Sequence, residues 1–302
     1  MTPTGGASST EMTWFLLSLT AALGLATADA LTKRFFSDLA PYRMGVVRIL
    51  STAPWMVLAL LFLPRAVPDQ TFWLAIAAAL PLEVFAFFLY MRALKLSPLS
   101  LSLPFLAFTP VFMILTGHLI LGETIRLGGV LGILLIVLGA YVLNLSKMKS
   151  GLLGPIRAVL REPGSWIMLL VSFIYSITAP IGKVAILHSN PWFFAAVYNL
   201  VLSAVIVSLW PVAAGGAGVR GTFSKPGPML LIGLMAAMEN FAHMMAIAQV
   251  EAAYMIAVKR LSLLFGVLYG AWWFGEENIR ERLAGAAIMI AGVFLIRWAQ
   301  AG

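Results

Sequence analysis

Long apolar segments separated by short polar connections follow one another along almost the whole chain. Each is roughly as long as the 20 or so apolar residues that an α-helix needs to cross the hydrocarbon core of a bilayer. They cover residues 12–31, 44–63, 72–91, 99–121, 128–145, 166–187, 191–213, 229–249, 252–274 and 283–298. This pattern predicts an all-α membrane protein with ten transmembrane helices.

The longest polar connection lies midway along the chain, at residues 146–165. It is basic, and its middle, residues 152–160, has the composition of a short helix lying in the membrane interface. A connection of this kind separates two halves of five predicted helices. We therefore expect a first five-helix unit at 1–148, a linker at 149–164 and a second five-helix unit at 165–302.

The two halves share a spaced pattern of residues, which indicates an internal repeat. Four residues of the first half recur 153 positions later in the second half. Gly122, Glu123, Gly132 and Gly139 correspond to Gly275, Glu276, Gly285 and Gly292. A Lys also precedes a Pro by eight residues in each half, as Lys33 with Pro41 and Lys183 with Pro191. Glycine is common in membrane helices, which is the alternative explanation. Because five spans is an odd number, a repeat of this length predicts two inverted five-helix repeats.

Basic residues favour one face of the predicted bundle in both halves. The loops after the odd-numbered spans hold Lys33, Arg34, Arg43, Arg92, Lys95, Arg220, Lys225, Arg280 and Arg282. Lys and Arg are enriched in cytoplasmic loops, so this bias places that face in the cytoplasm and both termini outside. We expect a multi-pass protein of the inner or plasma membrane, with the lipid bilayer as its surroundings.

Composition supports this class and excludes several others. The chain is 61% hydrophobic and 11% charged, whereas soluble domains are about 45–50% apolar and about 25% charged. It has no cysteine, and we expect neither a metal nor a cofactor. The net charge of +8 comes from residues at span ends rather than from a basic run, so no nucleic-acid partner is expected. No G-x-x-x-x-G-K-[ST] loop occurs, which argues against ATP as the direct energy source.

Two carboxylates lie in the middle of predicted spans, Glu83 in the third and Glu239 in the eighth. A charge at mid-bilayer costs at least about 2.5–3.5 kcal/mol, so such a residue is a functional candidate by default. Burial favours the protonated form of a carboxyl, which suits proton uptake and release. His243, one turn after Glu239, is a candidate proton relay. The alternative for all three is a hydrogen bond to a neighbouring helix.

Cations inside the spans are the matching candidates for binding a solute. Lys259 and Arg260 interrupt the ninth span, and Arg48 is a lone cation in the second. They can bind a carboxylate or phosphate, or Lys259 and Arg260 can pair with Glu239 or Glu83. Tyr90 is a further candidate, although aromatic residues at such positions more often only pack.

Other residues have expected structural or gating roles. Asp29 and Lys33 lie four apart on one helix and can neutralise each other. Glu123 and Glu276 end their spans at the water boundary, and Lys183 is the repeat counterpart of Lys33. Pro110 can interrupt a helix where its backbone lines a cavity. The pairs Gly132 with Gly139 and Gly285 with Gly292 each lie on one helix face and allow close helix contact.

Residues 109–139 and 261–292 resemble the drug/metabolite transporter superfamily, specifically its EamA-type members. The resemblance lies in a Pro-x-Phe at Pro110, a Gly-Glu at the helix end and the glycine-rich helix that follows. Lys33 and Arg48 also stand where the family usually has a Lys late in helix one and an Arg in helix two. Leu263 replaces the second-half counterpart of Pro110. The resemblance implies ten helices, cytoplasmic termini (opposite to the charge bias) and export of an amino acid or metabolite.

These observations predict a secondary transporter rather than an enzyme. The solute is expected to be small, organic and zwitterionic or anionic, because the interior holds both carboxylates and cations, and protons are the candidate coupling ion. The alternative is a membrane-embedded enzyme or scramblase acting on a lipid-linked substrate. An enzyme needs a convergent acid, base or metal cluster, whereas the three histidines, His118, His188 and His243, are far apart in the sequence.

Overall fold

The computed structural model describes residues 5–64, 66–96, 103–145, 163–214, 222–274 and 279–301, and the regular elements within these ranges are all helical. In chain order they are α1 (Gly5–Phe36), α2 (Pro41–Phe62), α3 (Gln70–Leu96), the 3₁₀ helix η1 (Leu103–Phe108), α5 (Thr109–Leu121), α6 (Leu127–Leu145), α8 (Pro163–Leu187), α9 (Pro191–Ser208), α10 (Trp210–Ala213), α11 (Pro226–Ile247), α12 (Ala252–Lys259), α13 (Ser262–Phe274) and α14 (Ile279–Ala301).

Within the described ranges, six helices are long and apolar enough to cross a membrane: α1, α2, α3, α8, α9 and α11. Shorter apolar helices cover Phe105–Leu121, Leu127–Val142 and Ala284–Gln300. Large apolar side chains such as Leu119, Phe294 and Trp298 are exposed on the outer surface of the bundle. These features confirm a helical membrane protein, whereas the total of ten spans stays a prediction.

Two of the predicted spans are interrupted; Pro110 was expected to interrupt the fourth, whereas the ninth was expected to be one continuous helix. The fourth span consists of η1 followed by α5, and the ninth consists of α12 followed by α13. In the fourth, Pro110 lacks the N–H that a continuous helix needs there, and the Thr109 hydroxyl instead donates to the Leu106 carbonyl at 2.7 Å. In the ninth, the chain tightens without a proline: the backbone N–H of Leu261 donates to the Val258 carbonyl three residues earlier, at 3.0 Å.

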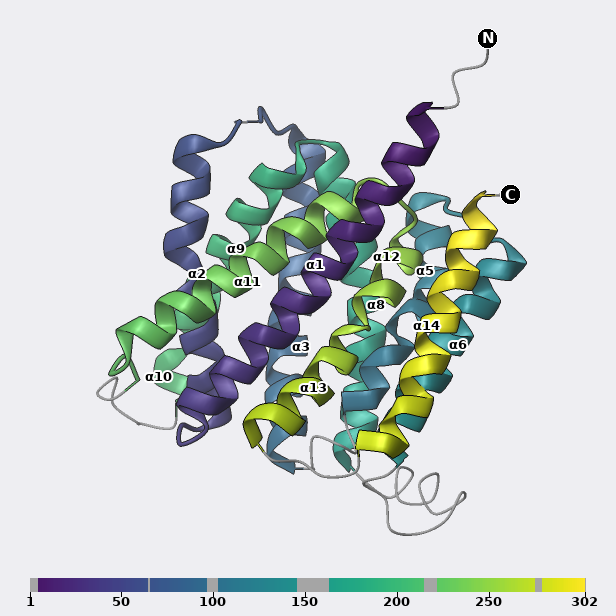
Figure 1. Ribbon diagram of the computed structural model, residues 1–302. Helices are drawn as coiled ribbons and strands as arrows, with labels where there is room; N and C mark the ends of the chain where they lie inside the picture. The colour runs from purple at the N-terminus through teal and green to yellow at the C-terminus, as the bar shows by residue number, and fades with distance from the viewer. Residues whose placement is uncertain are drawn as a thin grey trace.

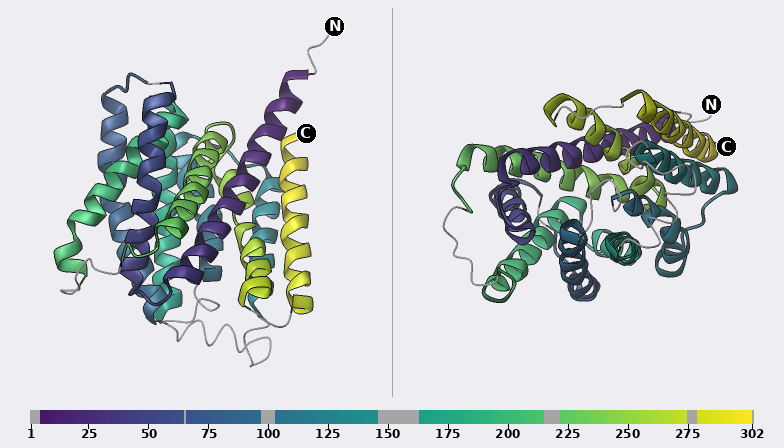
Figure 2. Two further views of the ribbon diagram at one scale, coloured as in Figure 1. Left: turned by 60° about the vertical axis from the view of Figure 1, so that its left-hand side comes forward. Right: turned by 90° about the horizontal axis from the view of Figure 1, so that it is seen from below.

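Helices from opposite halves of the chain form the most extensive contacts in the bundle. These contacts join α6 to α14, α3 to α8 and α1 to α11. Figure 1 shows α6 and α14 side by side at one flank and α1 lying against α11 across the bundle. The start of α1 and the end of α14 lie at the same end of the bundle, and the turned views in Figure 2 show the same arrangement.

The contact between α6 and α14 depends on glycines that let the two backbones meet. A Cβ atom on Gly132 would lie 2.7 Å from the Gly292 carbonyl oxygen, and one on Gly292 would lie 2.6 Å from the Gly132 carbonyl oxygen. A Cβ on Gly139 would lie 2.7 Å from the Gly285 carbonyl oxygen. No side chain can occupy these positions unless the helices move apart.

We expect Gly139→Leu and Gly292→Leu to lower the thermal stability of the purified protein in detergent. Overpacking a close-packed site typically costs about 1–3 kcal/mol, and here the obstructing atoms include backbone, which cannot rotate away. Gly266 on α13 is the matched control, because a Cβ there would meet nothing within 4 Å. Melting temperatures should fall for the first two variants and stay near the parent value for Gly266→Leu. Parent-like melting of both variants would show that the helices are loosely packed.

Candidate functional site

A cluster of three ionisable side chains joins α11 to the C-terminal end of α12. The Lys259 Nζ lies 2.5 Å from the Glu239 Oε1 and 2.6 Å from the His243 Nδ1. Glu239 and His243 are one turn apart on α11, with 3.8 Å between the same Glu239 oxygen and the His243 Nδ1. An ammonium group only donates hydrogen bonds, so the His243 Nδ1 accepts and the neutral ring carries its proton on Nε2. Lys259 is therefore committed to partners within the protein.

Arg260 connects the two interrupted spans directly. Its Nη2 donates to the Thr109 Oγ1 at 2.8 Å, so the residue after α12 contacts the first residue of α5. The same hydroxyl oxygen lies 3.0 Å from the Ser172 Oγ of α8. Among the residues that the structure describes, the buried Arg260 Nε has no hydrogen-bond partner and the guanidinium makes no ion pair. It thus retains donor capacity and a positive charge that suit an anionic group.

Glu83 lies in a different setting from Glu239. It accepts a hydrogen bond of 2.6 Å from the Thr178 hydroxyl, which connects α3 to α8. Within the described part of the chain it has no cation at ion-pair distance. Tyr175 and Tyr198 lie within electrostatic reach of the carboxylate. Glu83 is thus a partly buried carboxyl with no ion-pair partner among the described residues, and Lys259 lies within electrostatic reach of it.

A second ion pair connects α1 to α2, between the Asp29 carboxylate and the Arg48 guanidinium. The sequence suggested Lys33 as the partner of Asp29 and treated Arg48 as a lone cation; the latter was wrong. Both residues lie well inside their helices, yet their side chains are 49% and 26% exposed. Tyr90 of α3 lies within electrostatic reach of this pair and of Arg260. These charged groups part-way along the bundle are therefore not fully enclosed by the protein.

The remaining candidates lie at helix ends and helix contacts. Glu123 forms an ion pair with Lys183, 2.6 Å between the Oε1 and the Nζ, and its other oxygen accepts from the Ala252 N–H at 2.9 Å. Lys33 is exposed near the end of α1, and Pro110 lies in the first turn of α5. Glu276 lies outside the described residues.

Several polar residues near these charges were not singled out in the sequence. Thr109 and Thr178 contact Arg260 and Glu83 respectively, and neither carries a charge that would mark it in an apolar span. Within the described chain, further buried polar atoms lack a hydrogen-bond partner, and they belong to Ser51, Trp55, Tyr141, Tyr198, Asn199, Ser203 and Asn240. Asn199 and Asn240 could have been singled out in the sequence, because an uncharged amide inside a membrane span also needs a polar partner.

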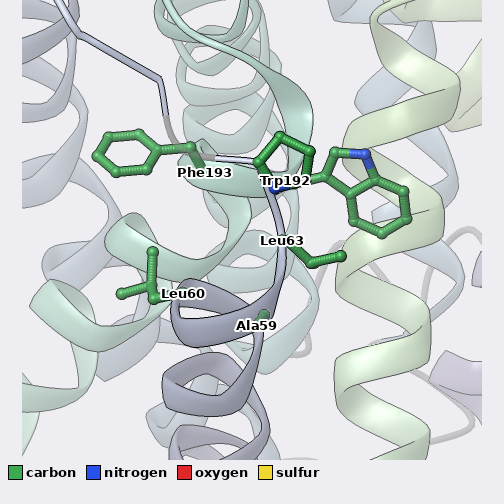
Figure 3. A pocket seen from close by; sticks show the side chains of 6 residues that line it. Ala59, Leu60, Leu63, Trp192 and Phe193 are labelled. Carbon is green, nitrogen blue, oxygen red and sulfur yellow. The ribbon is translucent and has the colours of Figure 1, made fainter.

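Figure 3 shows a small pocket at the junction of α2 and α9, and its lining is apolar. Its lining residues are Ala59, Leu60, Leu63, Pro64, Trp192 and Phe193. None of the ionisable candidates faces it. Among the described residues, no three His, Asp or Glu side chains gather as a metal site would require. The chemistry of the molecule is thus concentrated in the buried charged residues rather than in this pocket.

Comparisons with known proteins find relatives named as transporters and a solved structure of similar fold. The chain is 23% identical to an "Uncharacterized transporter" of Archaeoglobus fulgidus, and the alignment covers 93% of this chain and 96% of that protein. It is 25% identical to an "Uncharacterized transporter" of Methanothermobacter thermautotrophicus, and that alignment covers 62% of this chain and 53% of that protein. A solved crystal structure with a TM-score of 0.75 and 15% identity covers 95% of this chain and 97% of its own, which shows a shared fold.

The profile of the EamA-like transporter family matches the sequence twice, over residues 12–145 and 162–298. The two matches together account for most of the chain, and the second begins at residue 162, within the last three residues of the segment that was interpreted as a linker. The chain therefore belongs to the EamA-like transporter family, within the drug/metabolite transporter superfamily.

Proposed function

We propose that this transporter is a proton-coupled secondary carrier that exports a small zwitterionic or anionic solute, such as an amino acid or related metabolite, across the plasma membrane. The observation that carries the proposal is the contact of Arg260 with Thr109, which brings a partly buried cation with an unused donor to the junction of two interrupted spans. Discontinuous helices of this kind form the substrate and ion sites of many carriers.

The architecture that we propose is ten spans in two inverted five-helix repeats, at 1–148 and 165–302, connected by the linker 149–164. The double family match supports it. So do the two interruptions, because α5 begins at Thr109 and α13 begins 153 positions later at Ser262, the offset of the glycine pattern. The reciprocal contact of Gly132 and Gly292 is a further indication of symmetry. The orientation follows the basic residues, with both termini outside.

The proposed solute site contains one free charge of each sign. Arg260 binds the carboxylate of the solute, because its fork of N–H donors matches two carboxylate oxygens. Glu83 alternates between carboxylate and carboxylic acid, so it takes up one proton from one side of the membrane and releases it to the other. The Glu239–Lys259–His243 cluster keeps its internal partners and holds the end of α12 in place beside Arg260.

The solute itself can be identified in proteoliposomes. Radiolabelled amino acids, organic acids and amines would be tested for accumulation under an imposed pH gradient and for counterflow without one. A carrier should show counterflow, whereas a channel should equilibrate the solute without it. Movement of headgroup-labelled lipid, or its chemical conversion, in place of solute transport would instead favour the scramblase or enzyme.

We expect Arg260→Gln to raise the KM of a transported carboxylate by about 10- to 150-fold, since a hydrogen bond to a charged group contributes about 1.5–3 kcal/mol. An analogue that lacks the carboxylate is the control, and its KM should change little. Equal loss of transport for both solutes would show that Arg260 supports the structure instead of contacting the solute.

A further inference from the structure

A Gly-Glu pair at the end of α5 places one carboxylate between three helices. Gly122 has a φ of 69°, in the left-handed region, and lets the chain turn sharply as α5 ends. The turn brings Glu123 back against its own helix, where its Oε2 would lie 3.2 Å from a Cβ atom on Gly117. A side chain at position 117 would thus compete with the carboxylate for space. The turn and the small residue together aim Glu123 inward.

Glu123 binds two partners from the second half of the chain. The Lys183 Nζ of α8 lies 2.6 Å from its Oε1, and the backbone N–H of Ala252 donates to its Oε2 at 2.9 Å. Lys183 also donates to the Val250 carbonyl at 2.6 Å, just before α12 begins. The two side chains are only 12% and 11% exposed. We call Glu123 and Lys183 the clamp, because together they hold the chain on both sides of the start of α12.

The helix held by the clamp leads directly to the charged cluster. α12 consists of eight residues, Ala252–Lys259, all of them buried. At about 1.5 Å of rise per residue it spans on the order of 10 Å, so a short rigid rod separates the clamp from Lys259 and Arg260. A shift at the start of α12 is therefore transmitted to Lys259 and Arg260, instead of being absorbed by a flexible segment.

We propose that the clamp is a positioning device for the solute site, and that it opens and closes as the carrier changes conformation. The inference rests on the proposed carrier function. When closed, the clamp seals this end of the bundle and sets the position of Arg260. When it opens, both charges gain water, α12 is released and the site becomes accessible from this end. A buried ion pair suits such a switch because it has two discrete states, paired and dry or separated and hydrated.

The chain contains no native cysteine, so a single introduced thiol can report on this opening. Ala253→Cys places a thiol on fully buried α12, and Val67→Cys provides an exposed reference at a residue that is 97% exposed. Each would be combined with Glu123→Gln, Lys183→Met or Lys183→Arg, and the rate of reaction with a water-soluble maleimide would be measured in detergent. Glu123→Gln can still accept from the Ala252 N–H, so it tests the ion pair alone.

We expect Glu123→Gln and Lys183→Met to speed labelling of the thiol introduced by Ala253→Cys by roughly tenfold, within the range of a coupling of 1–3 kcal/mol. Labelling of the Val67→Cys reference should be unchanged, and Lys183→Arg should stay near the parent rate. If a single variant does not fold by size-exclusion chromatography, the double variant Glu123→Gln/Lys183→Met removes both charges and takes its place. Parent-like labelling in folded variants would overturn the clamp.

The same variants test the clamp independently of the proposed transport function. Labelling is measured on the purified protein and needs no solute, so it can respond even if no tested solute is transported. In proteoliposomes, the clamp variants should change the maximal exchange rate, because they alter opening, and should also raise the KM, because they release the helix that positions Arg260. A change confined to the KM, with parent-like labelling, would make Glu123 part of the solute site instead.

Discussion

Glu83→Gln is expected to abolish pH-driven accumulation of solute while exchange without a gradient continues. Glutamine keeps the size of the side chain, and its amide oxygen can still accept the hydrogen bond from Thr178. It cannot take up and release a proton. A carrier that needs a change of charge at this position would therefore lose its coupling and keep its fold.

Glu83→Asp is the matched control, because it keeps a titratable carboxyl and should retain part of the driven transport. Both variants would be purified, checked for monodispersity and reconstituted, and uptake would be followed with and without an imposed pH gradient. Full gradient-driven accumulation by Glu83→Gln would exclude Glu83 as the coupling site. Loss of exchange as well would indicate a role in binding the solute.

Breaking the Glu239–Lys259 pair should instead destabilise the protein. Lys259→Met leaves the buried Glu239 carboxylate without its cation and the His243 Nδ1 without its donor. Removing one partner of a buried ion pair typically costs about 3–5 kcal/mol, because the remaining charge is uncompensated. We expect a large fall in melting temperature and in the amount of protein that accumulates in the membrane.

The double variant Lys259→Met/Glu239→Gln tests the pairing itself. It removes both charges, so its melting temperature should lie above that of Lys259→Met alone. A thermodynamic cycle over the parent, both single variants and the double variant isolates the interaction from other effects of each substitution. Strictly additive losses would show that the two side chains do not stabilise each other, and Glu239 would again be a candidate for proton coupling.

These two expectations differ although the sequence treated Glu83 and Glu239 alike. Both are acids in the middle of apolar segments, and neither has an oppositely charged residue at helical spacing in its own segment. The difference arises from helix packing, which brings Lys259 into an ion pair with Glu239 and brings the Thr178 hydroxyl to Glu83. Contacts between residues far apart in the chain do not follow from the periodicity of one helix.

The interruption of the ninth span likewise could not be predicted from the periodicity of one helix. Proline marks the interruption of the fourth span in the sequence, whereas at Arg260 no helix-breaking residue is present. The side chain of Arg260 instead donates to Thr109 of the other interrupted span. This contact between distant residues lies next to the turn that interrupts the ninth span, although the local sequence there favours a continuous helix.

By itself, the sequence determined the class of this protein and its family. The excess of apolar residues has to face lipid, so long apolar segments become membrane helices whatever their partners are, and the family pattern of glycines, proline and Gly-Glu is readable without coordinates. It also selected Lys259, Arg260, Glu83 and Glu239, because charges in apolar segments are costly. Only the tertiary structure decided which of these charges neutralise one another, because in a helical bundle the partner comes from another helix. It also left Arg260 and Glu83 without an ion-pair partner among the described residues, which is why we propose them as the groups that bind the solute and the proton.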